Sequence, residues 1–176
     1  AFDTASAGSS KTVTLTGASL SGDDATNYTL NGVTSVTSTA TITAKALTVS
    51  ATGVNRVYDH TTAATVSLSD DRVSGDTLTV DYTSATFDTK NVGTGKTVTV
   101  AGLSLSGDDA TNYTLNGVTS VTSTANITAY ELTGSFTAGN KTYDGTTGAT
   151  VLSRSLSTVF GSDSVSLTGG TAAFDT

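Results

Sequence analysis

The sequence predicts an all-β protein built from tandem modules of about 85 residues. Each module is expected to be a small β-sandwich or a β-grasp-like sheet with at most one short helical turn. Three observations predict this class: apolar and polar residues alternate, turn-forming dipeptides separate the alternating runs, and long stretches recur at a fixed spacing. The 40 Thr and 23 Ser residues agree with it, because the β-branched Thr side chain suits a pleated strand while its hydroxyl faces water.

The alternating runs are the predicted strands. Residues 11–16 and 96–100 alternate polar residues with Val or Leu, and residues 34–44 place Val36, Ala40 and Ile42 on one face. Further runs of the same style occupy residues 46–51 and 76–82. A period of two indicates strands that bury one face and leave the other in water.

Turn signals lie between these strands. Asn31-Gly32 and Asn116-Gly117 are dipeptides typical of β-hairpins. Residues 21–28 are expected to form one short helical turn that begins with capping residues. The dipeptide Asp144-Gly145 is a further turn signal, and His60 replaces its Gly in the preceding copy, where it is expected to be an exposed turn residue.

The repeat is the strongest signal in the sequence. Phe2-Asp3-Thr4 recurs as Phe87-Asp88-Thr89, and residues 17–40 recur as residues 102–125 with one change, from Ala18 to Leu103. The sequence Phe-Asp-Thr returns once more at residues 174–176. The sequence is therefore interpreted as a little over two periods from a longer tandem array.

Composition excludes several classes of function. The chain has no Cys and a single His, which excludes disulfide scaffolds, thiolate sites and multi-His metal centres. A net charge of −7 with eight basic residues argues against nucleic acid or an anionic membrane as a partner. No acid–base pair or activated nucleophile stands out, so the chain is not expected to be an enzyme.

Several sequence motifs together resemble those of a known protein family. Residues 141–147 read KTYDGTT, residues 74–76 read SGD, and residues 105–115 read LSGDDATNYTL. These motifs resemble the YDG-domain repeats, and related MBG-type repeats look similar. The resemblance implies a tandem array in very large secreted bacterial adhesins, including filamentous-haemagglutinin-like proteins, and it implies no catalytic residues. The positions that match the family's name motif are Tyr58, Asp59, Tyr143, Asp144 and Gly145.

The resemblance also suggests where modules begin and end. In the family's usual phase, residues 45–129 form one complete module, residues 1–44 are the second part of a module, and residues 130–176 are the first part of the next. The alternative phase gives two whole modules, about 1–86 and 87–176. In the first phase the part-modules would expose core faces, so they should pair, within the chain or head-to-tail between chains. Modules are expected to join end to end, with strands running across the junctions and no flexible linker.

Two groups of residues are candidate binding sites. Oxygen-rich clusters could hold calcium, although their spacing matches no known loop and a capped helical turn explains them as well. The calcium candidates are Asp23, Asp24, Asn27, Asp108, Asp109 and Asn112. Recurring Tyr residues could stack on sugars or pack in the core: Tyr28, Tyr58, Tyr113 and Tyr143.

These inferences predict a structural stalk of a secreted bacterial surface adhesin, which projects a binding region from the cell. Its partners would be the neighbouring repeats of the same array, and no nucleic acid, membrane insertion or cofactor is expected. The alternative is that the repeats themselves bind carbohydrate, mucin or a biofilm-matrix polysaccharide.

Overall fold

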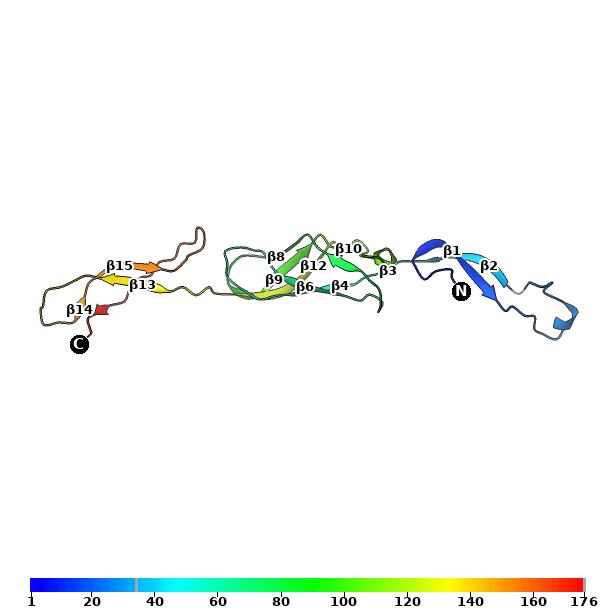
Figure 1. Cartoon of the computed structure of the whole chain (residues 1–176), viewed down its shortest axis with the longest axis horizontal. Coiled ribbons are helices and arrows are strands. Elements are labelled where there is room, and N and C mark those ends of the chain that lie inside the picture. The colour runs from blue at the N-terminus through cyan, green and yellow to red at the C-terminus, as the bar shows by residue number, and fades with distance from the viewer. Residues whose placement is uncertain (34, 176) are drawn as a thin grey trace.

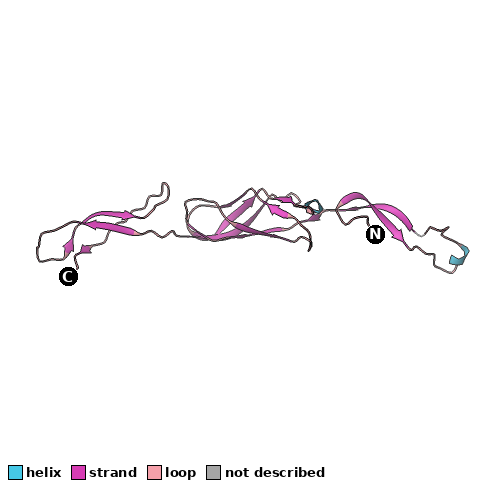
Figure 2. Cartoon of the chain, in the orientation of Figure 1, coloured by secondary structure: helices cyan, strands magenta, loops and turns pink. Residues whose placement is uncertain are grey.

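The computed structural model describes residues 1–33 and 35–175, so Thr34 of the strand predicted at 34–44 lies outside the described residues. The chain is elongated, with three segments in a row (Figure 1). We call residues 1–44 the N-terminal segment, residues 45–129 the central segment and residues 130–176 the C-terminal segment. Strands and loops make up almost all of the described chain, as Figure 2 shows, and the all-β prediction is confirmed.

The N-terminal segment is one antiparallel ribbon. Strand β1 (Gly8–Thr16) pairs with β2 (Ser35–Ile42), from Lys11 opposite Ala40 to Thr16 opposite Ser35. A bulge between Gly8 and Lys11 shifts the register. The 3-10 turn η1 (Ala25–Asn27) lies in the long connection between the two strands.

The central segment contains a four-stranded sheet in the order β5-β12-β9-β8. Strands β8, β9 and β12 are antiparallel, while β5 runs parallel to β12. The pairs β4-β6, β7-β10 and β3-β11 form smaller sheets, of which β3-β11 is parallel. The elements of this segment are β3 (Lys45–Ala46), β4 (Val49–Gly53), β5 (Arg56–Val57), β6 (Val66–Asp70), β7 (Thr79–Asp81), β8 (Ser84–Phe87), β9 (Gly93–Ala101), β10 (Ser104–Ser106), η2 (Ala110–Asn112), β11 (Tyr113–Thr114) and β12 (Ser120–Thr128).

The C-terminal segment contains two antiparallel pairs, β13-β15 and β14-β16. Its strands are β13 (Gly134–Ala138), β14 (Gly148–Ala149), β15 (Val151–Leu156) and β16 (Ala172–Ala173). These strands repeat the first half of the central segment, since β13-β15 corresponds to β4-β6. The N-terminal ribbon repeats the second half, because β1 pairs with β2 in the register that β9 adopts with β12, including the bulge.

The buried core lies in the central segment. Val98 and Val100 on β9 are 0% exposed, while Thr97 and Thr99 between them face water. All the buried residues among those described fall between residues 47 and 127: Leu47, Leu78, Ala85, Phe87, Val98, Val100, Leu103, Tyr113, Ala125 and Ile127. The predicted alternation of a dry and a wet face is therefore confirmed for β9.

Two layers close over this core. Strand β4 packs so tightly against β12 that a Cβ added to Gly53 would lie 3.0 Å from the Ala125 Cβ. The Gly53 amide also donates to the Ser123 hydroxyl of β12 at 3.0 Å. The β4-β6 pair thus covers the four-stranded sheet, an arrangement that resembles the predicted small sandwich.

Two local expectations need correction. Strands do not cross the junctions, because β2 ends at Ile42 before β3 begins at Lys45, and residues 129–133 between β12 and β13 belong to no strand. The Asp side chain that precedes each 3-10 turn makes no capping hydrogen bond, since both Asp24 and Asp109 lack one.

The Asn-Gly dipeptides form turns, with a positive φ at both residues as a type I′ turn requires. They lead into β2 and β12, however, and do not join two strands that pair with each other. No helix in the described part of the chain is long and apolar enough to cross a membrane.

Candidate functional site

The Tyr-Asp motif builds a braced turn in both copies. Asp59 Oδ1 accepts hydrogen bonds from the Thr61 amide (2.9 Å) and hydroxyl (2.8 Å), and Asp144 Oδ1 does the same with Thr146 (3.0 and 2.9 Å). A basic side chain three residues earlier pairs with each carboxylate. The hydrogen bonds from Lys141 and Thr146 hold the pKa of Asp144 below its ordinary value. Both Asp residues of the motif therefore stabilise a turn.

His60 lies inside this turn, between Asp59 and Thr61, in an unusual backbone conformation. Its φ is +69°, close to the +74° of the corresponding Gly145. A side chain in this left-handed region costs about 1 kcal/mol. His60 is half-buried at the boundary with the C-terminal segment, so the expectation of an exposed turn residue is wrong.

A cluster of polar groups around Asp163 bridges the central and C-terminal segments. The Tyr58 hydroxyl donates to Asp163 Oδ2 at 2.5 Å, and Lys90 Nζ donates to Asp163 Oδ1 at 2.9 Å. His60 Nδ1 lies 2.9 Å from the same Oδ1 and 2.8 Å from Lys90 Nζ. A neutral Nδ1 either donates to Asp163 or accepts from Lys90, so the tautomer selects one of these two hydrogen bonds.

This cluster shifts the pKa values of its members. The hydrogen bonds from Tyr58 and Lys90 hold the pKa of Asp163 well below its ordinary value. In return, the hydrogen bond with Asp163 raises the pKa of Lys90 and that of Tyr58. The carboxylate is thus kept ionised and Lys90 protonated, which is the state that holds the two segments together.

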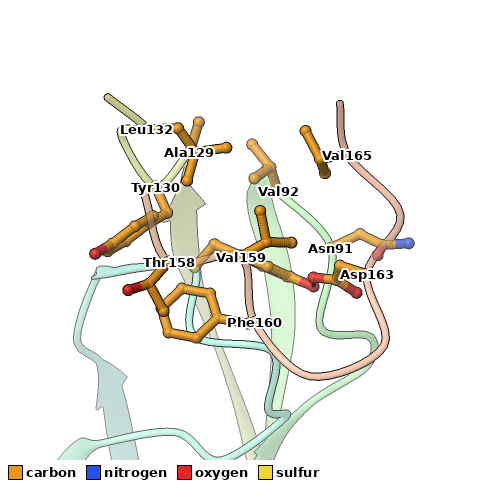
Figure 3. Close-up of a pocket in the computed structure, with 11 residues that line it drawn as sticks. Asn91, Val92, Ala129, Tyr130, Leu132, Thr158, Val159, Phe160, Asp163 and Val165 are labelled. Carbon is orange, nitrogen blue, oxygen red and sulfur yellow. Dashed lines mark hydrogen bonds between the residues drawn. The ribbon is translucent and has the colours of Figure 1, made fainter. Parts of the chain in front are cut away.

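Aromatic and aliphatic side chains complete this boundary. The Phe160 ring meets the Tyr130 ring edge-on at 4.7 Å between centroids and the Tyr58 ring at 6.1 Å. Beside them lies a pocket of about 310 Å³, mostly apolar, with Asp163 at one side (Figure 3). Its lining comes from both segments: Tyr58, Asn91, Val92, Ala129, Tyr130, Leu132, Thr158, Val159, Phe160, Asp163 and Val165. We call this set, together with His60 and Lys90, the C-terminal junction.

The boundary between the N-terminal and central segments has a corresponding pocket of about 330 Å³. Asp76 takes the place of Asp163 there, because the turn before each Asp is closed by a matching hydrogen bond. These are Asp76 N to Val73 O at 3.2 Å and Asp163 N to Phe160 O at 3.0 Å. The Tyr113 hydroxyl donates to Asp76 Oδ2 at 2.5 Å. We call this region the N-terminal junction.

The calcium candidates form turns. Asp109 Oδ2 accepts from the Thr77 amide at 2.8 Å, and Asn112 Oδ1 accepts from the Ala7 amide at 2.9 Å across the N-terminal junction. Asp24 and Asn27 are joined to each other by a long hydrogen bond of 3.4 Å. Within residues 1–33 and 35–175, no three Asp, Glu, His or Cys side chains are placed to hold a metal ion. The geometry therefore gives the calcium hypothesis no support, and it stays a prediction.

The recurring Tyr residues differ in environment. Tyr113 is buried in the core of the central segment, and Tyr58 is half-buried at the C-terminal junction. Tyr28 and Tyr143, their counterparts in the end segments, are 70% and 93% exposed. The four rings are spread over three segments of the elongated chain, so they are not gathered on one concave surface.

A family model for the YDG domain matches residues 1–38 and 43–123. The chain belongs to the YDG domain family. Comparisons with curated proteins and with solved structures gave no match. The second matching stretch of this YDG chain begins beside the boundary at residue 45, and it contains all but two of the buried residues, Ala125 and Ile127.

Sequence reasoning missed the residues that make the C-terminal junction. Asp163 and Phe160 belong to no motif, and insertions between residues 151 and 174 hide the match between Asp163 and Asp76. Lys90 opens a stretch, residues 90–96, that resembles the family's repeats, but nothing in that stretch predicts its contact with Asp163. The signal that could have found Asp163 is the Gly-x-Asp turn preceding it, which corresponds to Gly75-Asp76 after one inserted residue.

Proposed function

We propose that these YDG modules are extender repeats in the stalk of a secreted bacterial surface adhesin, and that they hold a binding region away from the cell. The resemblance to adhesin repeats, the internal repetition and the family assignment support this role. The partners of each module are then its neighbours in the array, and the site of action is the bacterial surface.

The observation that carries the proposal is the C-terminal junction. Two successive segments meet there through a charged cluster around Asp163 and an aromatic cluster around Phe160, which buries surface from both sides. A Gly-Ser linker would bend freely at this point. Direct packing between the two segments instead limits bending. A stalk has to resist bending if it is to hold a binding region far from the cell.

The proposal includes the module phase 45–129. The buried residues from Leu47 to Ile127 form three adjoining clusters that share partly buried neighbours, and the junctions lie at both ends of this stretch. In the alternative phase, a boundary near residue 86 would cut through β8, which pairs with β9 in the middle of that core.

The second candidate function is direct binding of carbohydrate by the repeats. Exposed Tyr28 and Tyr143 are the observation in its favour, since an exposed ring can stack on a sugar. In the central segment the equivalent rings already make contacts within the chain, since Tyr113 is buried in the core and Tyr58 packs at the C-terminal junction. We therefore favour the stalk.

The stalk role is tested by measuring how far the chain holds a binding domain above the cell envelope. One copy or two tandem copies of the chain are inserted between the anchor and the binding domain of a bacterial display protein. The height of that domain above the cell envelope is then measured by super-resolution microscopy. We expect each copy to add a constant increment, larger than that of a Gly-Ser linker of equal length. An increment no larger than the linker's would overturn the proposal.

Binding is tested separately on a glycan array and on immobilised mucin with the isolated chain. The stalk role predicts no saturable binding. Saturable binding that is lost in the Tyr28→Ala or Tyr143→Ala variant would establish the carbohydrate-binding alternative.

A further inference from the structure

The first and the last stretch of the central segment run side by side in the same direction. Residues 45–58 begin at the N-terminal junction and reach the C-terminal junction, and so do residues 113–128. Strand β3 pairs in parallel with β11 near the start of the two stretches, and β5 pairs in parallel with β12 near their end. The two stretches therefore span the central segment together, from one junction to the other.

Hydrogen bonds join the two stretches at both ends and between them. At the N-terminal junction, Leu47 N donates to Thr114 O at 2.9 Å. At the C-terminal junction, Tyr58 N donates to Thr128 O at 2.8 Å. Two side chains bridge the part between these ends: Ser123 Oγ accepts from Gly53 N at 3.0 Å, and Asn55 Oδ1 accepts from Asn126 N at 2.7 Å.

Close packing opposes sliding of one stretch along the other. Gly53 lies so near β12 that an added Cβ would be 2.9 Å from the Thr124 carbonyl oxygen and 3.0 Å from the Ala125 Cβ. Ala125 itself is buried. Movement of residues 45–58 along β12 would bring a residue with a side chain to a place where only Gly fits. The packing therefore locks the register of the two stretches.

Tension along the chain loads these contacts in shear. The N-terminal segment joins the central segment at one end and the C-terminal segment joins it at the other (Figure 1). A pull on the two end segments draws residues 45–58 toward one end and residues 113–128 toward the opposite end. Because the two stretches are parallel, the hydrogen bonds between them then carry the load at the same time. Antiparallel first and last stretches would begin and end on the same side, and their bonds would break one after another.

We infer that residues 45–58 and 113–128 form a mechanical clamp, through which the central segment resists being stretched along its length. Forced unfolding is governed by the height of the unfolding barrier. Bonds that have to break together add to one barrier, although each contributes little by itself. The inference rests on the module boundaries proposed above. It goes beyond the stalk role, because a stalk can hold a binding region at a distance without resisting tension.

Optical tweezers test the clamp by pulling on the full chain from chosen points. The native chain has no Cys, so DNA handles attach only where a Cys is introduced. In the double variant Thr43→Cys, Glu131→Cys, the handles lie just outside the two ends of the clamp, at exposed positions. We expect the central segment to resist and then to unfold in a single step, because the bonds of the clamp fail together.

A second pulling direction serves as the control. In the double variant Thr43→Cys, Thr111→Cys, both handles lie at the N-terminal end of the clamp, so the pull peels β3 away from β11 one pair at a time. The unfolding force should be several-fold lower than in the first direction. Equal forces in the two directions would overturn the inference.

Variants pulled in the first direction test which bonds carry the load. Asn55→Ala combined with Ser123→Ala removes both side-chain links between the stretches and should lower the unfolding force. Ser106→Ala is the matched control, because the Ser106 hydroxyl donates to Asp81 Oδ2 at 2.7 Å between β10 and β7, outside the clamp. The inference also fails if the control lowers the force as much as the double variant does. Such a failure would leave the stalk proposal untouched, because the height of a binding domain above the cell envelope is measured without tension on the chain.

Discussion

At the scale of the residue, burial decides what each repeated side chain contributes. Ile127 and Ile42 occupy the same position of the repeat, and the four residues before them differ only at Asn126 and Thr41. Even so, Ile127 is 1% exposed and Ile42 is only half-buried. The sequence could identify both as apolar strand positions. It could not rank them, because burial depends on the second layer, which only the central segment has within residues 1–33 and 35–175.

Ile127→Ala is therefore expected to lower the free energy of unfolding by about 2–5 kcal/mol, since it removes buried methylene groups and leaves a cavity. Ile42→Ala should cost clearly less. Urea denaturation followed by circular dichroism measures both values. Equal losses in the two variants would contradict the assignment of the core to the central segment.

Acid should weaken the C-terminal junction. The hydrogen bonds from Tyr58 and Lys90 lower the pKa of Asp163, so the carboxylate contributes stability above the pKa of an unfolded Asp, about 3.9. That contribution is lost as the pH falls through the lowered pKa of the folded state. NMR contacts between the Tyr58 and Phe160 rings should fade as the pH drops below about 4.

Two matched variants check that acid weakens the C-terminal junction through Asp163: Asp163→Asn is the test and Asp175→Asn is the control. Asp163→Asn removes the charge that binds Lys90, so the ring contacts should already be weak at neutral pH. Asp175 is exposed, and its replacement should leave the contacts and their pH dependence unchanged. Ring contacts that survive both low pH and Asp163→Asn would show that the aromatic packing alone holds the junction.

At the scale of the element, the alternating pattern predicted where strands occur better than it predicted which strands pair. The runs at 11–16 and 96–100 lie in β1 and β9. The run at 46–51 is divided between β3 and β4, with residues 47 and 48 in neither strand, and the run at 76–82 shortens to β7 (Thr79–Asp81). Alternation depends only on which face meets water. Pairing and strand ends depend on backbone partners brought from elsewhere in the chain, so the break between β12 and β13 could not be seen in advance.

The contact between β4 and β12 makes Gly53 sensitive to substitution. A Cβ on Gly53 would lie 2.9 Å from the Thr124 carbonyl oxygen, so the two layers have to separate. Gly53→Ala is expected to destabilise the chain by about 1–3 kcal/mol. Gly148→Ala, whose Cβ would meet nothing within 4 Å, should change the stability by at most about 0.5 kcal/mol. Thermal unfolding of the two variants makes the comparison.

At the scale of the whole molecule, the shape should be visible in solution. A compact chain of 176 residues would have a radius of gyration of about 16 Å. The three segments lie in a row, so small-angle X-ray scattering of the monomeric chain should give a clearly larger value. A radius near the compact value would mean that the segments fold back on one another, contrary to the extended arrangement.

The sequence by itself determined the all-β class, the repeat, the wet and dry faces of the strands and the YDG motifs, because these follow from local patterns and from copying within the chain. Only the tertiary structure decided that Tyr58, Lys90 and Asp163 meet, and that Tyr143 has no such contact. The physical reason is that a junction forms between residues far apart in sequence. Identical residues therefore become core, junction or exposed surface according to which part of the chain lies opposite them.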